Sequence, residues 1–129
     1  MSQENVDIVR RCLETFETDE DAWLQTLDPE LEWYPIEDGH IRRLGHEAAL
    51  GVRRRWLESW DDHQVDVEEV KDGGDSVVVG QHLSGRGKGS GLEVDFRVYL
   101  HFKLRDGRVS YVYEYADRGE ALEAAGLSE

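Results

Sequence analysis

The sequence contains a single cysteine, Cys12, among its 129 residues. One cysteine excludes an internal disulfide and any zinc site built from several cysteines. Because Cys12 lies in a stretch with helical periodicity, we interpret it as a small buried apolar residue and not as a nucleophile. No apolar run approaches the ~20 residues that span a bilayer, and no secretory leader pattern opens the chain. We therefore expect a cytoplasmic protein that makes no contact with a membrane.

Basic residues are also scarce, since 15 Lys and Arg stand against 29 Asp and Glu, a formal net charge of −14. Proteins that bind nucleic acid or anionic membranes need a basic surface, so this balance argues against both partners. The acidic residues are spread along the chain, which is typical of a solvated surface. With 39% hydrophobic and 34% charged residues, the composition predicts one globular domain over 1–129.

Residue periodicity divides the chain into an early helical part and a later part made of strands. Apolar spacings of three and four residues predict helices over 3–17, about 20–27 and 46–60. The remaining elements are, in order, a short strand at LEWYP, a loop over 35–45, antiparallel strands up to Tyr115, and a short helix to Gly126 with Asp117 as N-cap. Helices followed by such strands indicate an α+β fold, in which the helices cover one face of a curved sheet.

The order of these elements and five local motifs resemble the SnoaL-like, polyketide cyclase-like branch of the nuclear transport factor 2-like superfamily. The motifs are ENVDIVRRCLETF, LDPELEWYP, GHEAAL, GSGLEVDFRV and the pair LRDGRV and DRGEAL. The resemblance covers nearly the whole chain. It implies a cone, in which a strongly bent antiparallel sheet wraps a layer of N-terminal helices and leaves a pocket at the open end. It also implies chemistry without a cofactor.

The direction of Glu114 depends on the turn between the last two strands. If Asp106 and Gly107 are the central residues of a primed turn, Glu114 faces outward. If Arg105 and Asp106 form a type I turn followed by a glycine bulge, the pairing shifts by one residue and Glu114 faces inward. The second register pairs Val98 with Glu114, Leu100 with Val112, and Phe102 with Ser110. In the similar ketosteroid isomerases the matching last-strand positions line the pocket, so we adopt the bulge and an inward Glu114.

An inward Glu114 has two interpretations. Loss of solvation among apolar side chains raises the pKa of a carboxylate toward the range of a general base. The similar polyketide cyclases use an acidic residue at this position, so Glu114 is our candidate catalytic residue. A buried glutamate that is only hydrogen-bonded to a neighbour, such as Gln81 or Tyr34, explains the same position equally well.

Other catalytic groups of the family are missing. The cyclase histidine and the isomerase acid of the fourth strand both match Leu100, and the isomerase base matches Tyr34 before Pro35. The isomerase tyrosine of the first helix matches Cys12. We therefore do not expect steroid isomerisation by that mechanism. Tyr34 is retained as a candidate catalytic residue only as a hydrogen-bond donor to an enolate, a role that Gln81 could also fill.

Seven residues are predicted to line the pocket and contact a small hydrophobic ligand. Trp33 is expected on the inner wall because a flat apolar surface suits an aromatic or polycyclic molecule, although plain core packing explains a tryptophan as well. The full set is Trp33, Trp56, Gln81, Val98, Leu100, Phe102 and Val112.

The five histidines show no metal-site spacing, so no metal is predicted. His82 and His101 are expected on the outward face, His63 near the surface, His40 in a loop above the pocket mouth and His46 as a helix cap.

Two functions follow for this pocket. The first is a cofactor-independent cyclase, isomerase or lyase, in which Glu114 abstracts a proton next to a carbonyl group. The second is a module of the same fold that binds a hydrophobic ligand, or takes part in assembly, without catalysis.

On the outer sheet face the same register pairs Tyr99 with Tyr113 and His101 with Tyr111. Aromatic side chains of this kind predict a homodimer through a face that the helices leave uncovered.

Overall fold

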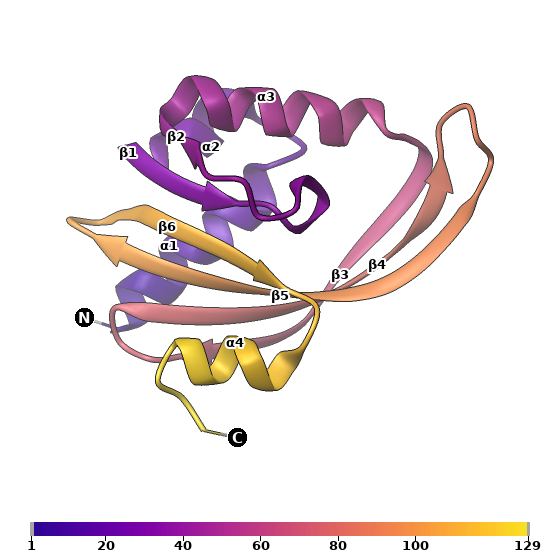
Figure 1. Ribbon diagram of the computed structural model, residues 1–129. Helices are drawn as coiled ribbons and strands as arrows, with labels where there is room; N and C mark the ends of the chain where they lie inside the picture. Colours follow the sequence, from indigo (N-terminus) through magenta and orange to yellow (C-terminus); the bar gives the residue numbers. More distant parts are fainter. Residues whose placement is uncertain (1, 129) are drawn as a thin grey trace.

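The computed structural model describes residues 2–128 and has an α+β architecture (Figure 1). The helices in this range are α1 (Ser2–Thr15), α2 (Glu20–Gln25), α3 (Gly45–Glu58) and α4 (Arg118–Ala124), with a short 3-10 helix, η1 (Ile36–Asp38). The strands are β1 (Leu27–Tyr34), β2 (Arg43–Leu44), β3 (Trp60–Asp72), β4 (Ser76–Gly87), β5 (Glu93–Arg105) and β6 (Arg108–Tyr115). The predicted α+β fold class is confirmed, and the loop predicted over 35–45 contains η1 and β2.

The six strands form one sheet in the order β2-β1-β6-β5-β4-β3. The expected antiparallel pairing holds from β3 to β6 and between β1 and β2, but β1 runs parallel to β6, so the sheet is mixed. Figure 1 shows that β3, β4 and β5 bend strongly, with α3 on one side of the sheet and α4 on the other. The register of β3 against β4 shifts at two places, and such bulges bend a strand. The sheet therefore curves around α1, α2 and α3 as a cone.

The helix ends follow local capping chemistry. The carboxylate of Asp19 accepts a hydrogen bond from the backbone N–H of Ala22 at the start of α2, and Asp117 accepts one from Glu120 at the start of α4. The predicted capping role of Asp117 is confirmed. The predicted second helix runs two residues too far, because Leu27 already pairs with Val109 in the sheet.

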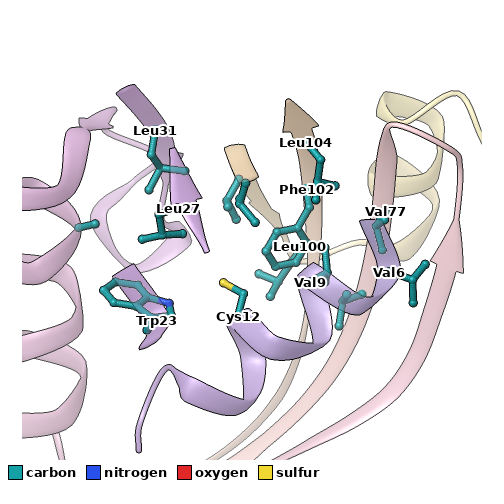
Figure 2. Close-up of a cluster of buried hydrophobic side chains, with 14 of the residues drawn as sticks. Val6, Val9, Cys12, Trp23, Leu27, Leu31, Val77, Leu100, Phe102 and Leu104 are labelled. Atoms are coloured by element: carbon teal, nitrogen blue, oxygen red, sulfur yellow. The ribbon is translucent and has the colours of Figure 1, made fainter. Parts of the chain in front are cut away.

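Buried apolar side chains form a main core between the three N-terminal helices and the concave face of the sheet (Figure 2). In Figure 2 Cys12 on α1 lies between Trp23 of α2 on one side and Phe102 of β5 on the other. A smaller core lies on the convex face, where Ala121 and Leu122 of α4 pack against Val78 together with partly buried residues such as Tyr99 and Tyr115. The expectation that no helix covers the outer face is therefore wrong, since α4 covers its β4–β5 part.

The turn between β5 and β6 differs from the predicted one. Asp106 and Gly107 both have positive φ, 53° and 77°, and Arg105 pairs directly with Arg108. These are the marks of the two-residue primed turn, so the predicted type I turn with a glycine bulge is wrong.

The extra residue lies three positions later, in β6 itself. Leu104 pairs with Val109 and Lys103 pairs with Tyr111, so Ser110 has no partner in the ladder. Its hydroxyl donates instead to the Lys103 carbonyl oxygen at 3.2 Å. The observed pairs are Leu100 with Glu114, Phe102 with Val112, His101 with Tyr113 and Tyr99 with Tyr115. Each differs by two residues from the predicted register, which leaves the side-chain faces unchanged.

No helix within residues 2–128 has both the length and the hydropathy that crossing a membrane requires.

The hairpin turn gives a test of the left-handed conformation at Gly107. Gly107 has φ of 77°, so Gly107→Ala places a Cβ in the left-handed region and should lower the free energy of unfolding by about 1–2 kcal/mol. Gly107→Asn is the matched control, because asparagine tolerates this conformation, and it should lose less. Denaturant unfolding of both variants measures the difference, and equal stabilities for alanine and glycine would contradict the positive φ at Gly107.

Candidate functional site

A cavity of about 580 Å³ lies between the helices and the concave face of the sheet. Its walls come from α1, α2, α3, η1 and strands β1, β3, β4, β5 and β6. All seven residues expected to line a pocket are on it: Trp33, Trp56, Gln81, Val98, Leu100, Phe102 and Val112. Most of this lining is apolar, as expected for a site that holds a hydrophobic molecule.

Glu114 lies on the cavity wall, and its carboxylate is held by two donors from other elements. Trp33 Nε1 donates to Glu114 Oε2 at 2.8 Å, and the backbone N–H of Ile36 donates to Oε1 at 3.1 Å. Glu114 therefore ties β6 to β1 and to η1. Its side chain keeps some exposure because it faces the cavity, although protein surrounds it on every other side.

Burial raises the pKa of Glu114 above the ordinary value for glutamate. The hydrogen bonds from Ile36 and Trp33 act in the opposite direction because they stabilise the charged form, and the charge of nearby Glu37 raises the pKa further. Burial has the largest effect. The inward direction of Glu114 predicted from the sequence agrees with the structure, although the turn on which that prediction was based does not.

A second carboxylate at the cavity, Glu37, was not predicted. Glu37 is part of η1, lies at the exposed mouth and has no hydrogen bond or ion pair within residues 2–128. Partial burial raises its pKa, and the neighbouring Asp38 adds to this effect. No sequence pattern predicts the direction of its side chain, because a single turn of 3-10 helix after Pro35 shows no hydrophobic period.

The Tyr34 side chain does not line the cavity. The prediction that its hydroxyl donates a hydrogen bond to a bound ligand is therefore wrong. Neighbouring residues of a strand point to opposite faces, and Trp33 takes the inner one. The Tyr34 ring packs against Tyr111 and Tyr113 on the convex face, and its hydroxyl donates to Glu32 Oε1 at 2.7 Å. This hydrogen bond to a carboxylate is the main cause of the raised pKa of Tyr34. Gln81 remains as the predicted donor that lines the cavity.

The histidines lie around the cavity and not in its lining. His40 Nε2 is 2.6 Å from the Glu114 carbonyl oxygen, and its ring stacks on Tyr113. His46 does not cap α3 as predicted, because its Nε2 contacts the Leu27 carbonyl oxygen at 2.9 Å. His82 bonds the exposed Asp95, while the remaining histidine on the outward face, His101, is almost fully buried.

Two further features bear on the chemistry of the site. In the part of the chain that the structure describes, no group of three or more His, Cys, Asp or Glu side chains is placed to hold a metal ion. Cys12 lines the cavity, but burial raises the pKa of its thiol to about 11, so it is a neutral thiol at pH 7. This agrees with its interpretation as a small buried residue.

One side of the cavity is a chain of aromatic rings. Phe16 contacts Trp23, Trp33 and Trp56 with ring centroids 5.3, 6.2 and 6.4 Å apart, and Trp56 contacts Trp60 at 5.1 Å. Trp56 Nε1 donates to Glu17 Oε2 at 2.7 Å. The opposite side is aliphatic, with residues such as Val65, Leu83, Val98 and Leu100. We refer to the five rings as the aromatic wall.

Comparison with known proteins gives a consistent result. The family model for the SnoaL-like domain matches residues 9–112. An inferred SnoaL-like polyketide cyclase from Jannaschia sp. CCS1 superposes with a TM-score of 0.78 at 25% identity, covering 99% of this chain and 95% of that one. Bal32a, from a soil-derived mobile gene cassette, has a TM-score of 0.78 at 20% identity, with coverages of 93% and 94%. TerC, co-crystallised with polyporic acid, has a TM-score of 0.76 at 19% identity, with coverages of 95% and 98%. No curated protein matches the chain by sequence.

The raised pKa of Glu114 predicts a defined dependence of stability on pH. The folded protein holds this proton more tightly than the unfolded chain, whose glutamate has an ordinary pKa of 4.5. The resulting stability is fully present below pH 4.5 and is lost as the pH rises through the folded pKa. We therefore compare the free energy of unfolding of the wild type with that of Glu114→Gln. The difference, wild type minus variant, should decrease as the pH rises through this window, by at most about 1.4 kcal/mol per pH unit.

Urea unfolding from pH 4 to pH 8 measures this difference. Glu123→Gln, which removes an exposed carboxylate on α4, controls for the change in net charge. A wild-type advantage over Glu114→Gln that grows with pH would show a depressed pKa and would contradict the assignment.

Proposed function

The chain belongs to the SnoaL-like domain family, and from this premise we propose that it is a cofactor-independent acid–base enzyme acting on a hydrophobic carbonyl compound. The single observation that carries the proposal is the Glu114 carboxylate, which has a raised pKa on the wall of an apolar cavity. The family includes members of many functions, so the argument rests on this cavity and not on the fold.

Glu114 suits the role of a general base. A base is most effective when its pKa lies near the working pH, and burial moves Glu114 in that direction. The donors Trp33 and Ile36 each occupy one lone pair of a carboxylate oxygen and fix its orientation. Each oxygen keeps a second lone pair that can accept a proton. In the reaction, Glu114 takes a proton from the carbon next to the substrate carbonyl, and the electron pair of that C–H bond forms the enolate.

Gln81 is the proposed partner of this step. Its side chain lines the cavity from β4, next to Val98 on β5, and makes no hydrogen bond to another residue within 2–128. The amide N–H is thus available to donate to an enolate oxygen, which lowers the energy of the charged intermediate. The apolar Leu100 lies directly opposite Glu114 and supplies no second donor.

The alternative function is a ligand-binding or assembly module without catalysis. The observation that favours it is the same pair of hydrogen bonds, because a carboxylate that joins β6, β1 and η1 has a structural role already. In that case the cavity holds a hydrophobic molecule and Glu114 maintains its shape.

Hydrogen–deuterium exchange on a probe ketone separates the two functions without knowledge of the natural substrate. With 2-tetralone in D₂O, the wild type should accelerate deuterium uptake next to the carbonyl, and the rate should rise with pH through the raised pKa of Glu114. Glu114→Gln should lower the enzymatic rate by about 10²-fold or more. Gln81→Leu should lower it by about tenfold or more, because the enolate loses its donor.

Quenching of tryptophan fluorescence checks that the ketone enters the cavity of each variant. A ketone that binds the wild type and exchanges only at the buffer rate would favour the binding module.

We further propose a homodimer through the convex sheet face. Tyr34, Tyr111 and Tyr113, with the stacked ring of His40, form a half-buried aromatic patch beside the part that α4 covers. Rings of this size suit a twofold interface in which the patch meets its own copy. The charge of −14 on each subunit opposes association, so salt should strengthen the dimer by screening.

Sedimentation at micromolar concentration tests this proposal. We expect a dimer that tightens at high salt and that Tyr111→Asp converts to a monomer, since the substitution places a new charge in the patch. The matched Glu123→Gln variant should remain dimeric. A monomeric wild type at both low and high salt would contradict the interface.

A further inference from the structure

The charged side chains that line the cavity all have the same sign. Among the residues that the structure describes, the cavity lining includes four carboxylates and no lysine, arginine or histidine. Glu114 lies inside, while Glu14, Glu17 and Glu37 lie toward the exposed mouth. Glu17 is partly compensated, because Trp56 donates to it and His63 Nε2 lies 2.7 Å from the same oxygen. Glu37 has no hydrogen bond or ion pair within 2–128, and Arg55, whose charge acts to lower its pKa, is itself bonded to Asp38.

All five rings of the aromatic wall line the cavity, and two of their indole N–H groups are already used. Trp33 Nε1 is bonded to Glu114 and Trp56 Nε1 is bonded to Glu17. The cavity is thus rich in acceptors and π-surfaces and poor in hydrogen-bond donors. Because Trp33 Nε1 donates to Glu114 Oε2 at 2.8 Å, the carboxylate lies at the edge of the indole ring, and a cation over the face of this ring also lies near the carboxylate.

These features suit a cation with an apolar body. A positive charge over a tryptophan face gains about 0.5–2 kcal/mol, and a nearby carboxylate in a region of low dielectric adds to it. An anionic ligand would lose its hydration and meet only like charges. The overall charge of −14 acts in the same sense, since it raises the local concentration of cations near the cavity mouth.

We propose that the cavity selects hydrophobic cations, of the class of quaternary ammonium compounds and protonated tertiary amines, and excludes carboxylates. In this arrangement the cationic head lies between Glu114, Trp33 and Glu37, and the apolar body lies along the aliphatic side of the cavity. The inference deepens the proposed function and rests on it, because it names the class of compound that the same cavity accepts. A cationic group near the carbonyl of a substrate would also stabilise the enolate where Leu100 supplies no donor.

Three ligands of matched shape test the charge preference. They are (2-naphthylmethyl)trimethylammonium, its neutral carbon isostere 2-neopentylnaphthalene, and the anion 2-naphthylacetate. The quaternary cation cannot donate a conventional hydrogen bond or lose a proton, so it reports only charge and ring contact. Titration calorimetry should give a dissociation constant for the cation about tenfold or more below that of the isostere at low salt. That ratio should shrink as salt is added, and the anion should not compete.

Two variants with the same change in net charge locate the effect. Glu37→Gln should weaken cation binding about threefold to tenfold and leave the neutral isostere unchanged. Glu123→Gln on α4, outside the cavity, should leave both ligands unchanged. Tryptophan fluorescence of each variant at neutral pH confirms that it is folded.

Four results would overturn the inference. These are equal binding of the cation and the isostere, competition by the anion, equal effects of Glu37→Gln and Glu123→Gln, and absence of cation binding up to about 1 mM. The exchange assay uses a neutral ketone and depends on Glu114, so a failure of the charge preference leaves that assay positive. A failure of the proposed catalysis instead leaves the charge preference measurable.

Discussion

The direction of the Glu114 side chain depends on one extra residue in the ladder between β5 and β6. The primed turn at Asp106 and Gly107 alone would place Glu114 on the convex face and turn Tyr111, Tyr113 and Tyr115 toward the cavity. Ser110 adds one residue to β6, and this reverses the faces of every later residue of the strand. Val112 and Glu114 then face the cavity, while Tyr111 and Tyr113 face outward. Both proposed sites, the cavity and the tyrosine patch, follow from this one irregularity.

A carboxylate that is turned inward must be stabilised in some way, because burial of an unpaired charge is costly. The structure provides two donors, from the indole of Trp33 and the backbone of Ile36, and both come from segments that precede Glu114 by more than 70 residues in the sequence. The same contacts fix the end of β1 and the start of η1, which brings Glu37 to the mouth of the cavity. Position and chemistry are therefore coupled, since the group that can act as a base also holds the wall on which it lies.

Local patterns in the sequence were sufficient for the elements and for much of the cavity lining. Alternation in β5 predicts which of its residues face inward, and the capping motif at Asp117 predicts the start of α4 correctly. The alternation in LEWYP places Trp33 inward and therefore Tyr34 outward. The prediction that Tyr34 contacts a ligand in the cavity was inconsistent with this alternation.

The bulge at Ser110 has no distinctive signature, because a serine in a strand is unremarkable in sequence. The inward direction of Glu114 was predicted correctly only because the predicted bulge at Gly107 and the observed bulge at Ser110 each shift the pairing by one residue. A shift of one residue in either direction turns the same side chains inward. Glu37 was missed for a different reason, since its direction depends on a contact between η1 and Glu114 that links distant residues.

The composition of the cavity limits the reactions that it can support. Its N–H donors are used internally, apart from Gln81 and the buried indole nitrogen of Trp60, which has no acceptor among residues 2–128. A reaction that builds a full negative charge on oxygen needs several donors directed at that atom. With a neutral ketone, one amide supplies only part of this stabilisation. A substrate with its own positive charge adds to this stabilisation, because the charge that develops on the enolate is compensated within the ligand. The preference for cations and the use of Glu114 as a base are thus compatible in one site, and the scarcity of donors connects them.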